Sequence, residues 1–188
     1  MEELIRQSVQ NLSSPDDQVR YTALQAVLKA TDFQVDWAYE VWNELVSMLN
    51  HENSYHRSIA VKVLCNLAKS DSENRIEKEI GRLLQLTNDQ KFVTSRQCIQ
   101  SIWKVGVSNK PLRKKVIDHL AQQYVECVNG KHSNLIRQDI IQSLRNLYDS
   151  VHDEAIKEKA LELITIETEA KNRKKYAAFW KDIIEKGK

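Results

Sequence analysis

Apolar residues recur along this chain at the spacing of one face of an α-helix. After Arg20, for example, apolar side chains follow three, four and seven positions later. Residues with these spacings lie on the same side of a helix, so the pattern predicts a helix with one buried face. Copies of the pattern, looser after the second, begin at Arg20, Arg57, Arg96, Arg137 and Arg173.

These arginines lie 37, 39, 41 and 36 residues apart. A period near forty residues is that of two helices with their turns. Segments with the same apolar rhythm lie between the copies, such as the segment from Trp37 to Leu49. The sequence therefore predicts an all-α chain, an α-α superhelix of about five helix pairs that forms a single domain over residues 1–188. We expect ten helices at residues 2–12, 15–30, 33–50, 53–69, 72–87, 90–107, 110–129, 133–149, 153–168 and 171–186.

Helix-start signals support several of these boundaries. Pro111 suits the first turn of a helix, because the N–H group that proline lacks has no helical partner there. Thr31 with Gln34, and Ser70 with Glu73, have the spacing of a capping box. We therefore expect helices to begin just after Thr31 and Ser70.

The segment Asp17-Gln18-Val19-Arg20-Tyr21-Thr22-Ala23-Leu24 resembles the short signature of the HEAT repeat family, at the start of that repeat's second helix. The resemblance covers nearly the whole chain and implies a helical solenoid. It also implies a ladder in which turn aspartates and helix arginines join neighbouring repeats. In this chain Asn53 and Asn134 replace the aspartate in two copies, which predicts weaker rungs there. The ladder that the resemblance implies contains Asp17, Arg20, Arg57, Arg96 and Arg137.

Each arginine-marked helix also has a polar stripe opposite its apolar face. In HEAT-type folds these helices line the concave surface, as the resemblance implies. Amides and hydroxyls with a few lysines suit a peptide or protein partner better than a phosphate backbone. Any exposed helix face is polar, however, so a surface without a partner is the other interpretation. The expected groove consists of Tyr21, Gln25, Lys29, Ser58, Lys62, Gln97, Ser101, Gln138, Gln142 and Asn146.

Composition narrows the class of protein. The net charge is +2, from 28 basic and 26 acidic residues, so no overall field favours nucleic acid or an anionic membrane. Three widely spaced cysteines, Cys65, Cys98 and Cys127, fit neither a disulfide framework nor a zinc site. They predict buried, reduced thiols in a cytoplasmic protein. No segment approaches the roughly 18 apolar residues of a membrane span, so we expect no membrane partner.

The sequence contains no recognisable catalytic arrangement. Its five histidines lie mostly in or beside predicted turns, and none pairs at the spacing of two metal ligands on one helix. Glu167 and Glu169 are interpreted as a solvated helix face, and at least three of the four tryptophans as core residues. We therefore expect no enzyme activity, no metal and no cofactor.

The last predicted helix is basic. Its lysines and arginine alternate with Tyr176, Phe179 and Trp180, and basic residues among aromatic ones are typical of nucleic-acid contacts. A solenoid also needs a polar terminal repeat, and this soluble cap is the interpretation that we favour. The candidate basic patch consists of Arg173, Lys174, Lys175 and Lys181.

The sequence thus predicts a non-catalytic scaffold that binds a protein or peptide in a polar concave groove. The alternative is a nucleic-acid-binding or DNA-repair protein, since the DNA alkylation repair glycosylases are also HEAT-like solenoids. A lyase or maturation factor of the kind that has short HEAT-like repeats fits less well, because the period here is longer.

Overall fold

The computed structural model describes residues 1–127 and 130–186, and the side chains of the last helix up to residue 183. Within these ranges the chain is all α-helical and contains no strand. The α-helices are α1 Glu3–Asn11, α2 Asp17–Ala30, α3 Ala38–Met48, α4 Ser54–Leu67, α5 Ile76–Gln85, α6 Phe92–Ser108, α7 Lys110–Glu126, α8 Ser133–Val151, α9 Glu154–Thr165, α10 Ala170–Ala178 and α11 Lys181–Lys186. Short 3-10 helices, η1 Ala68–Ser70 and η2 Leu86–Asn88, follow α4 and α5.

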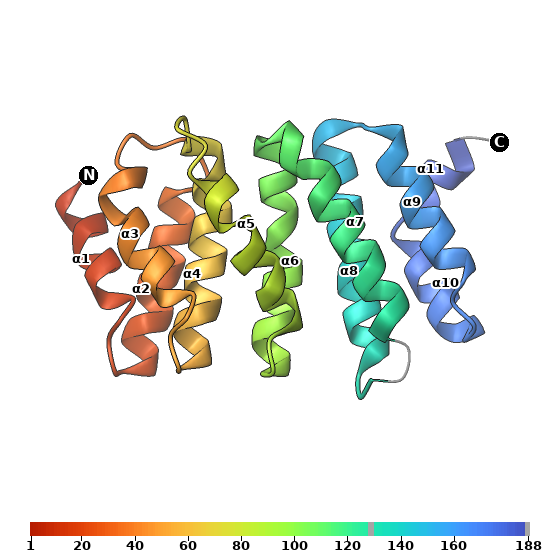
Figure 1. Cartoon of the computed structure of the whole chain (residues 1–188), viewed down its shortest axis with the longest axis horizontal. Coiled ribbons are helices and arrows are strands. Elements are labelled where there is room, and N and C mark those ends of the chain that lie inside the picture. The colour runs from red at the N-terminus through yellow and green to blue at the C-terminus, as the bar shows by residue number, and fades with distance from the viewer. Residues whose placement is uncertain (128–129, 187–188) are drawn as a thin grey trace.

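The helices stand in a row from α1 at one end to α10 and α11 at the other, so the termini lie far apart (Figure 1). We call α2, α4, α6, α8 and α10 the even layer, because each contacts the next one along the row. The odd layer consists of α1, α3, α5, α7 and α9, each of which packs on its following even helix. Contacts between successive helix pairs are the arrangement of a helical solenoid. The chain is therefore an all-α repeat solenoid.

One continuous hydrophobic core lies between the two layers. Residues from the repeated apolar pattern are fully buried in it, including Val27, Leu64, Ile99 and Leu144. Burial of one such side chain contributes about 1.5–3 kcal/mol to folding. The predicted tryptophans Trp37, Trp42 and Trp180 are buried too, which confirms their place in the core.

The cysteines follow their prediction. Cys65 and Cys98 are buried and Cys127 is half-buried, all as free thiols. Burial raises the pKa of Cys65 to about 12, so this thiol stays protonated at neutral pH. These side chains therefore act as small apolar core residues.

Two odd-layer helices begin later than predicted, because the expected caps have other partners. Helix α3 begins at residue 38 rather than 33. Thr31 Oγ1 donates to the carbonyl oxygen of Val27 at 2.8 Å, so it belongs to the end of α2. Helix α5 begins at residue 76 rather than 72, and the carboxylate of Asp71 accepts the N–H groups of Arg75 and Ile76. Both predicted capping boxes were therefore wrong.

The predicted helix at 171–186 is two helices, so the described residues form eleven α-helices rather than ten. Arg145 of α8 donates from Nη1 to the carbonyl oxygen of Phe179 at 2.5 Å. The N–H of Ile183 bonds instead to the carbonyl oxygen of Trp180. A contact with the preceding repeat thus replaces the helical bond that would have joined α10 to α11. The predicted end of the seventh helix at residues 128 and 129 lies outside the described residues.

Candidate functional site

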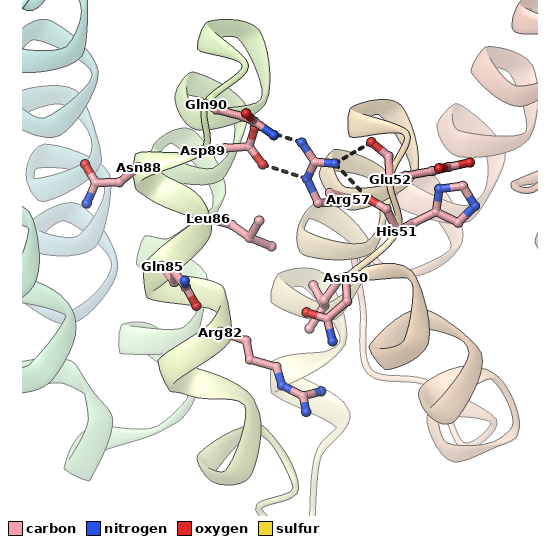
Figure 2. A pocket seen from close by; sticks show the side chains of 11 residues that line it. Asn50, His51, Glu52, Arg57, Arg82, Gln85, Leu86, Asn88, Asp89 and Gln90 are labelled. Carbon is pink, nitrogen blue, oxygen red and sulfur yellow. Dashed lines mark hydrogen bonds and ion pairs between the residues drawn. The ribbon is translucent and has the colours of Figure 1, made fainter.

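Arg57 fixes the joint between the second and third helix pairs. It lies in a cleft of about 510 Å³ that is bounded by the turn before α4, by α5 and by the turn after η2 (Figure 2). Its Nε and Nη2 atoms lie 2.7 and 2.9 Å from the carboxylate oxygens of Asp89, and Nη1 donates to the carbonyl oxygens of His51 and Glu52. The hydrogen bonds to Asp89 raise the pKa of Arg57. This fork is occupied within the chain and is not free for a phosphate.

Two further arginines join successive repeats in the same way. Arg96 of α6 binds Asp139 of α8 through Nε and Nη2, at 2.5 and 3.0 Å. Arg137 Nη1 lies 3.0 Å from Glu167 Oε2, with only 8% and 3% of the two side chains exposed. The sequence placed Glu167 on a solvated face, which is wrong because its partner Arg137 is buried. Charge-assisted hydrogen bonds of this kind are roughly twice as strong as those between neutral groups.

The first arginine differs from the others. Arg20 binds Asp17 of its own helix and donates to the carbonyl oxygen of Ser14. Asp17 therefore does not join two repeats. Its predicted place in the ladder between repeats was wrong. The other acceptors lie 32, 43 and 30 residues beyond their arginines, so a search of the preceding turn missed them. They are Asp89, Asp139 and Glu167.

The free face of the even layer holds a hollow of about 330 Å³ between α2 and α4, reaching Gln97 of α6. We call it the Lys62 hollow. Half of the predicted groove residues line it, so the fold brings these five together: Tyr21, Gln25, Ser58, Lys62 and Gln97. This is the largest group of predicted site residues that the structure gathers in one place.

Three further residues line this hollow that the helical spacing did not predict. Leu24 and Ile59 are buried core residues that also form its apolar wall, and Tyr55 stands at its edge with 60% of its surface exposed. Tyr55 lies in the first turn of the predicted helix at residues 53–69, but it was not among the predicted groove residues. The guanidinium of Arg20 lies 5.6 Å from the Tyr55 ring centroid.

A second hollow of about 390 Å³ adjoins the first, between the starts of α4 and α6. We call it the Phe92 hollow. It shares Tyr55, Ser58 and Gln97 with the Lys62 hollow, so Tyr55 stands between two neighbouring cavities. Val93 adds a further side chain that is 60% exposed. The two hollows thus form one surface across three even-layer helices.

The other predicted groove residues lie elsewhere. Ser101 is buried, and its hydroxyl donates to the carbonyl oxygen of Gln97. Gln142 and Asn146 of α8 bond to each other at 3.0 Å, and Gln138 is half-buried on the same helix. Lys29 lines a different hollow beside α1. The predicted stripe therefore does not continue as one lined hollow along all even helices.

The candidate basic patch is exposed, whereas two of its three aromatic neighbours are buried and Phe179 is half-buried. Arg173, Lys174 and Lys175 are exposed on α10, and Lys181 is exposed at the start of α11. Tyr176 and Trp180 have 0% of their surface exposed, because they pack in the core. Their rings are therefore not available to stack on bases.

Comparison with solved structures identifies the same architecture. An engineered protein superposes with a TM-score of 0.61 at 13% identity, covering 95% of this chain and 78% of that chain. A designed armadillo repeat protein in complex with the peptide (KR)4 gives a TM-score of 0.57 at 19% identity, covering 95% and 80%. Another designed armadillo repeat protein gives 0.55 at 18% identity, covering 93% and 79%. These likenesses show the fold alone.

No protein-family model matches the chain, and no curated protein matches it. Over the described residues, no group of three or more histidine, cysteine or acidic side chains is arranged to hold a metal ion. None of the helices in that part of the chain is both long and apolar enough to cross a bilayer.

Proposed function

We propose that residues 1–188 form a single, non-catalytic cytoplasmic scaffold that binds a protein or peptide on the free face of the even layer. The observation that carries this proposal is the pair of adjoining hollows around Tyr55. Exposed tyrosines above an apolar wall with nearby amides are typical of protein-binding surfaces. Solenoids commonly use such extended surfaces for binding.

We further infer that the repeats are of the HEAT type. Each repeat here has two α-helices, whereas armadillo repeats have three. The designed armadillo protein in complex with a peptide supports a binding role only by analogy of fold, which is weak evidence of function. The hollows of this chain therefore carry the argument.

The test is capture of a partner from cell lysate by the immobilised protein, compared with a Tyr21→Ala/Tyr55→Ala variant. Both tyrosines are 60% exposed, so their loss leaves the core intact. Aromatic side chains contribute much of the binding energy at many interfaces. We therefore expect the amount of partner retained by the double variant to be lower by about ten-fold or more. Mass spectrometry identifies and quantifies the retained protein.

Phe33→Ala is the matched control, because Phe33 is 80% exposed and lines neither hollow. It should retain as much partner as the unchanged protein. Equal retention by the double variant would contradict the proposed surface. Nuclease treatment of the lysate tests the alternative function. If the retained material is lost only after nuclease treatment, nucleic-acid binding is favoured.

A further inference from the structure

The layers of the first three repeats differ in charge. Among the charged residues of α2, α4 and α6, Asp17 is the one acid, and the bases are Arg20, Lys29, Arg57, Lys62, Arg96 and Lys104. The charged residues of α1, α3 and α5 are mostly acidic: Glu3, Glu40, Glu44, Glu77 and Glu79 against Arg6, Lys78 and Arg82. The even layer is therefore basic on this half of the molecule, although the whole chain is nearly neutral.

The arginines of the even layer do not supply this surface charge, because each binds a carboxylate of the chain. The lysines have no such partner in the part of the chain that the structure describes. Lys104 Nζ lies 2.5 Å from the neutral Oδ1 of Asn66. Lys62 lines its hollow with neither an ion pair nor a hydrogen-bond partner among the described residues. The positive charge that no carboxylate of the described residues compensates is thus carried by Lys29, Lys62 and Lys104, of which Lys62 lines the Lys62 hollow.

The position of Lys62 makes this charge available to a ligand. Its ammonium is partly withdrawn from water, and this burial lowers the pKa of Lys62, with Lys104 adding to the effect. The other charges on the hollow, Arg20 and Asp17, neutralise each other. A carboxylate placed in the hollow would gain a charge-assisted hydrogen bond to Lys62 without displacing an internal partner.

We propose that the Lys62 hollow binds a side-chain carboxylate of an acidic, extended peptide, whose neighbouring residues pack on Tyr21 and Tyr55. This inference rests on the proposed function and names the chemistry of the partner. The apolar wall of Leu24 and Ile59 favours a peptide, because peptide side chains can pack apolar atoms against it and the phosphates of a nucleic acid cannot.

A nucleic acid matches the surface less well. Its affinity depends on several simultaneous phosphate contacts. Here the forks of Arg57 and Arg96 are held by carboxylates, and Lys62 is the one cation without an ion pair among the described residues that line the Lys62 hollow. The carboxylate ligand is therefore the occupant that the hollow selects.

Fluorescence anisotropy with the full chain tests this proposal. The probes are labelled (DE)4, (NQ)4 and (KR)4 peptides, the last being the peptide bound in the designed armadillo complex, and a single-stranded oligothymidine of charge equal to (DE)4. The (DE)4 peptide presents carboxylates in every register. We expect it to bind at least about ten-fold more tightly than the other three probes, as one charge-assisted bond provides.

Lys62→Gln is expected to weaken (DE)4 binding about ten-fold or more, since it removes the charge while keeping most of the stem. The matched control is Lys78→Gln, which makes the same charge change at an exposed position on α5, in the odd layer. It should leave the affinity unchanged. Circular dichroism of both variants verifies that they are folded.

Equal weakening by the two substitutions, or none by Lys62→Gln, would overturn the proposal, because binding would then follow overall charge or another site. Tighter binding of the oligothymidine than of (DE)4 would overturn it in favour of a phosphate ligand. If (NQ)4 or (KR)4 binds best and is lost in Tyr21→Ala/Tyr55→Ala, the acidic partner is wrong while the proposed function stands. If no peptide binds, and the Tyr21→Ala/Tyr55→Ala variant captures as much partner from lysate as the unchanged protein, both the acidic-peptide proposal and the proposed function are wrong.

Discussion

The interface between α6 and α8 is closed, whereas the interface between α2 and α4 is open on its free face. Helices α6 and α8 pack closely along their length, and the hydroxyl of Ser143 donates to the carbonyl oxygen of Ile99 at 2.5 Å. Helices α2 and α4 make fewer close approaches and leave the Lys62 hollow between them. Near their far ends, Asn66 donates to Leu28 and Thr31.

The difference follows from the side chains that meet. A small serine at the α6–α8 contact lets two backbones approach, and its hydroxyl satisfies a carbonyl group there. Tyr21 and Lys62 are too long for such an approach, so they line a gap instead. One repeat architecture thus contains both a structural joint and an accessible surface, depending on side-chain size.

The largest expected effect comes from a buried rung of the arginine ladder. Arg137→Ala leaves Glu167, which is 3% exposed, without its ionic partner. Loss of one partner of a buried ion pair costs about 3–5 kcal/mol of unfolding free energy. Urea denaturation followed by circular dichroism measures this loss.

Asp17→Ala is the comparison, because the Asp17 side chain is 84% exposed. Its partner Arg20 is only 8% exposed but keeps its hydrogen bond to the carbonyl oxygen of Ser14, so this variant should lose less unfolding free energy than Arg137→Ala. Similar losses in the two variants would contradict the distinction between rungs that join repeats and the pair within α2.

An intermediate effect is expected from filling the two interfaces. Ser143→Leu places a larger side chain in the closed contact, and overpacking costs about 1–3 kcal/mol. Ser58 is itself only 5% exposed, but it borders both hollows, so a leucine there has space to extend and should cost less than Ser143→Leu. Thermal and urea unfolding of the pair measure the difference, and equal destabilisation would mean that the α2–α4 interface is as closed as the α6–α8 interface.

The smallest effect concerns pH at the open interface. Burial lowers the pKa of His56, and the nearby His51 and Arg20 lower it further. The unfolded chain therefore takes up a proton near pH 6.5, where the folded chain does not. The contribution of His56 to stability is fully present above that pH. It is lost as the pH falls through the lowered pKa that His56 has in the folded chain.

We expect His56→Gln to reduce the loss of stability between about pH 7.5 and 5.5. Urea midpoints at the two pH values measure it. Burial also lowers the pKa of His119, whose ring lies 2.8 Å from the Thr87 hydroxyl, so part of the pH dependence should remain. An unchanged pH dependence in His56→Gln would show that His56 does not couple this interface to pH.

The sequence by itself determined the repeat architecture. Apolar residues at helical spacing mark the buried face of each helix, and Val27, Leu64 and Ile99 are in the core as that spacing requires. The recurring arginines gave the period of the repeat. These features are local, because the face that a helix buries depends on residues within a few turns of each other.

Part of the candidate site also followed from this periodicity. Tyr21, Gln25 and Lys62 lie opposite the apolar face of their helices, and the fold places all three on one hollow. Lys29 and Asn146 satisfy the same rule but lie away from it. Helical spacing gives the direction of a side chain and not the distance to the next helix.

Only the tertiary structure decided which of these residues meet. The carboxylates bound by Arg57 and Arg137 come from the next repeat, and Glu167 became a core residue through that contact. The gap between α2 and α4, and the absence of an ionic partner for Lys62 within the described residues, depend on side chains of different repeats. The spacing between two helices is set by all the side chains between them, so no single segment of sequence contains it.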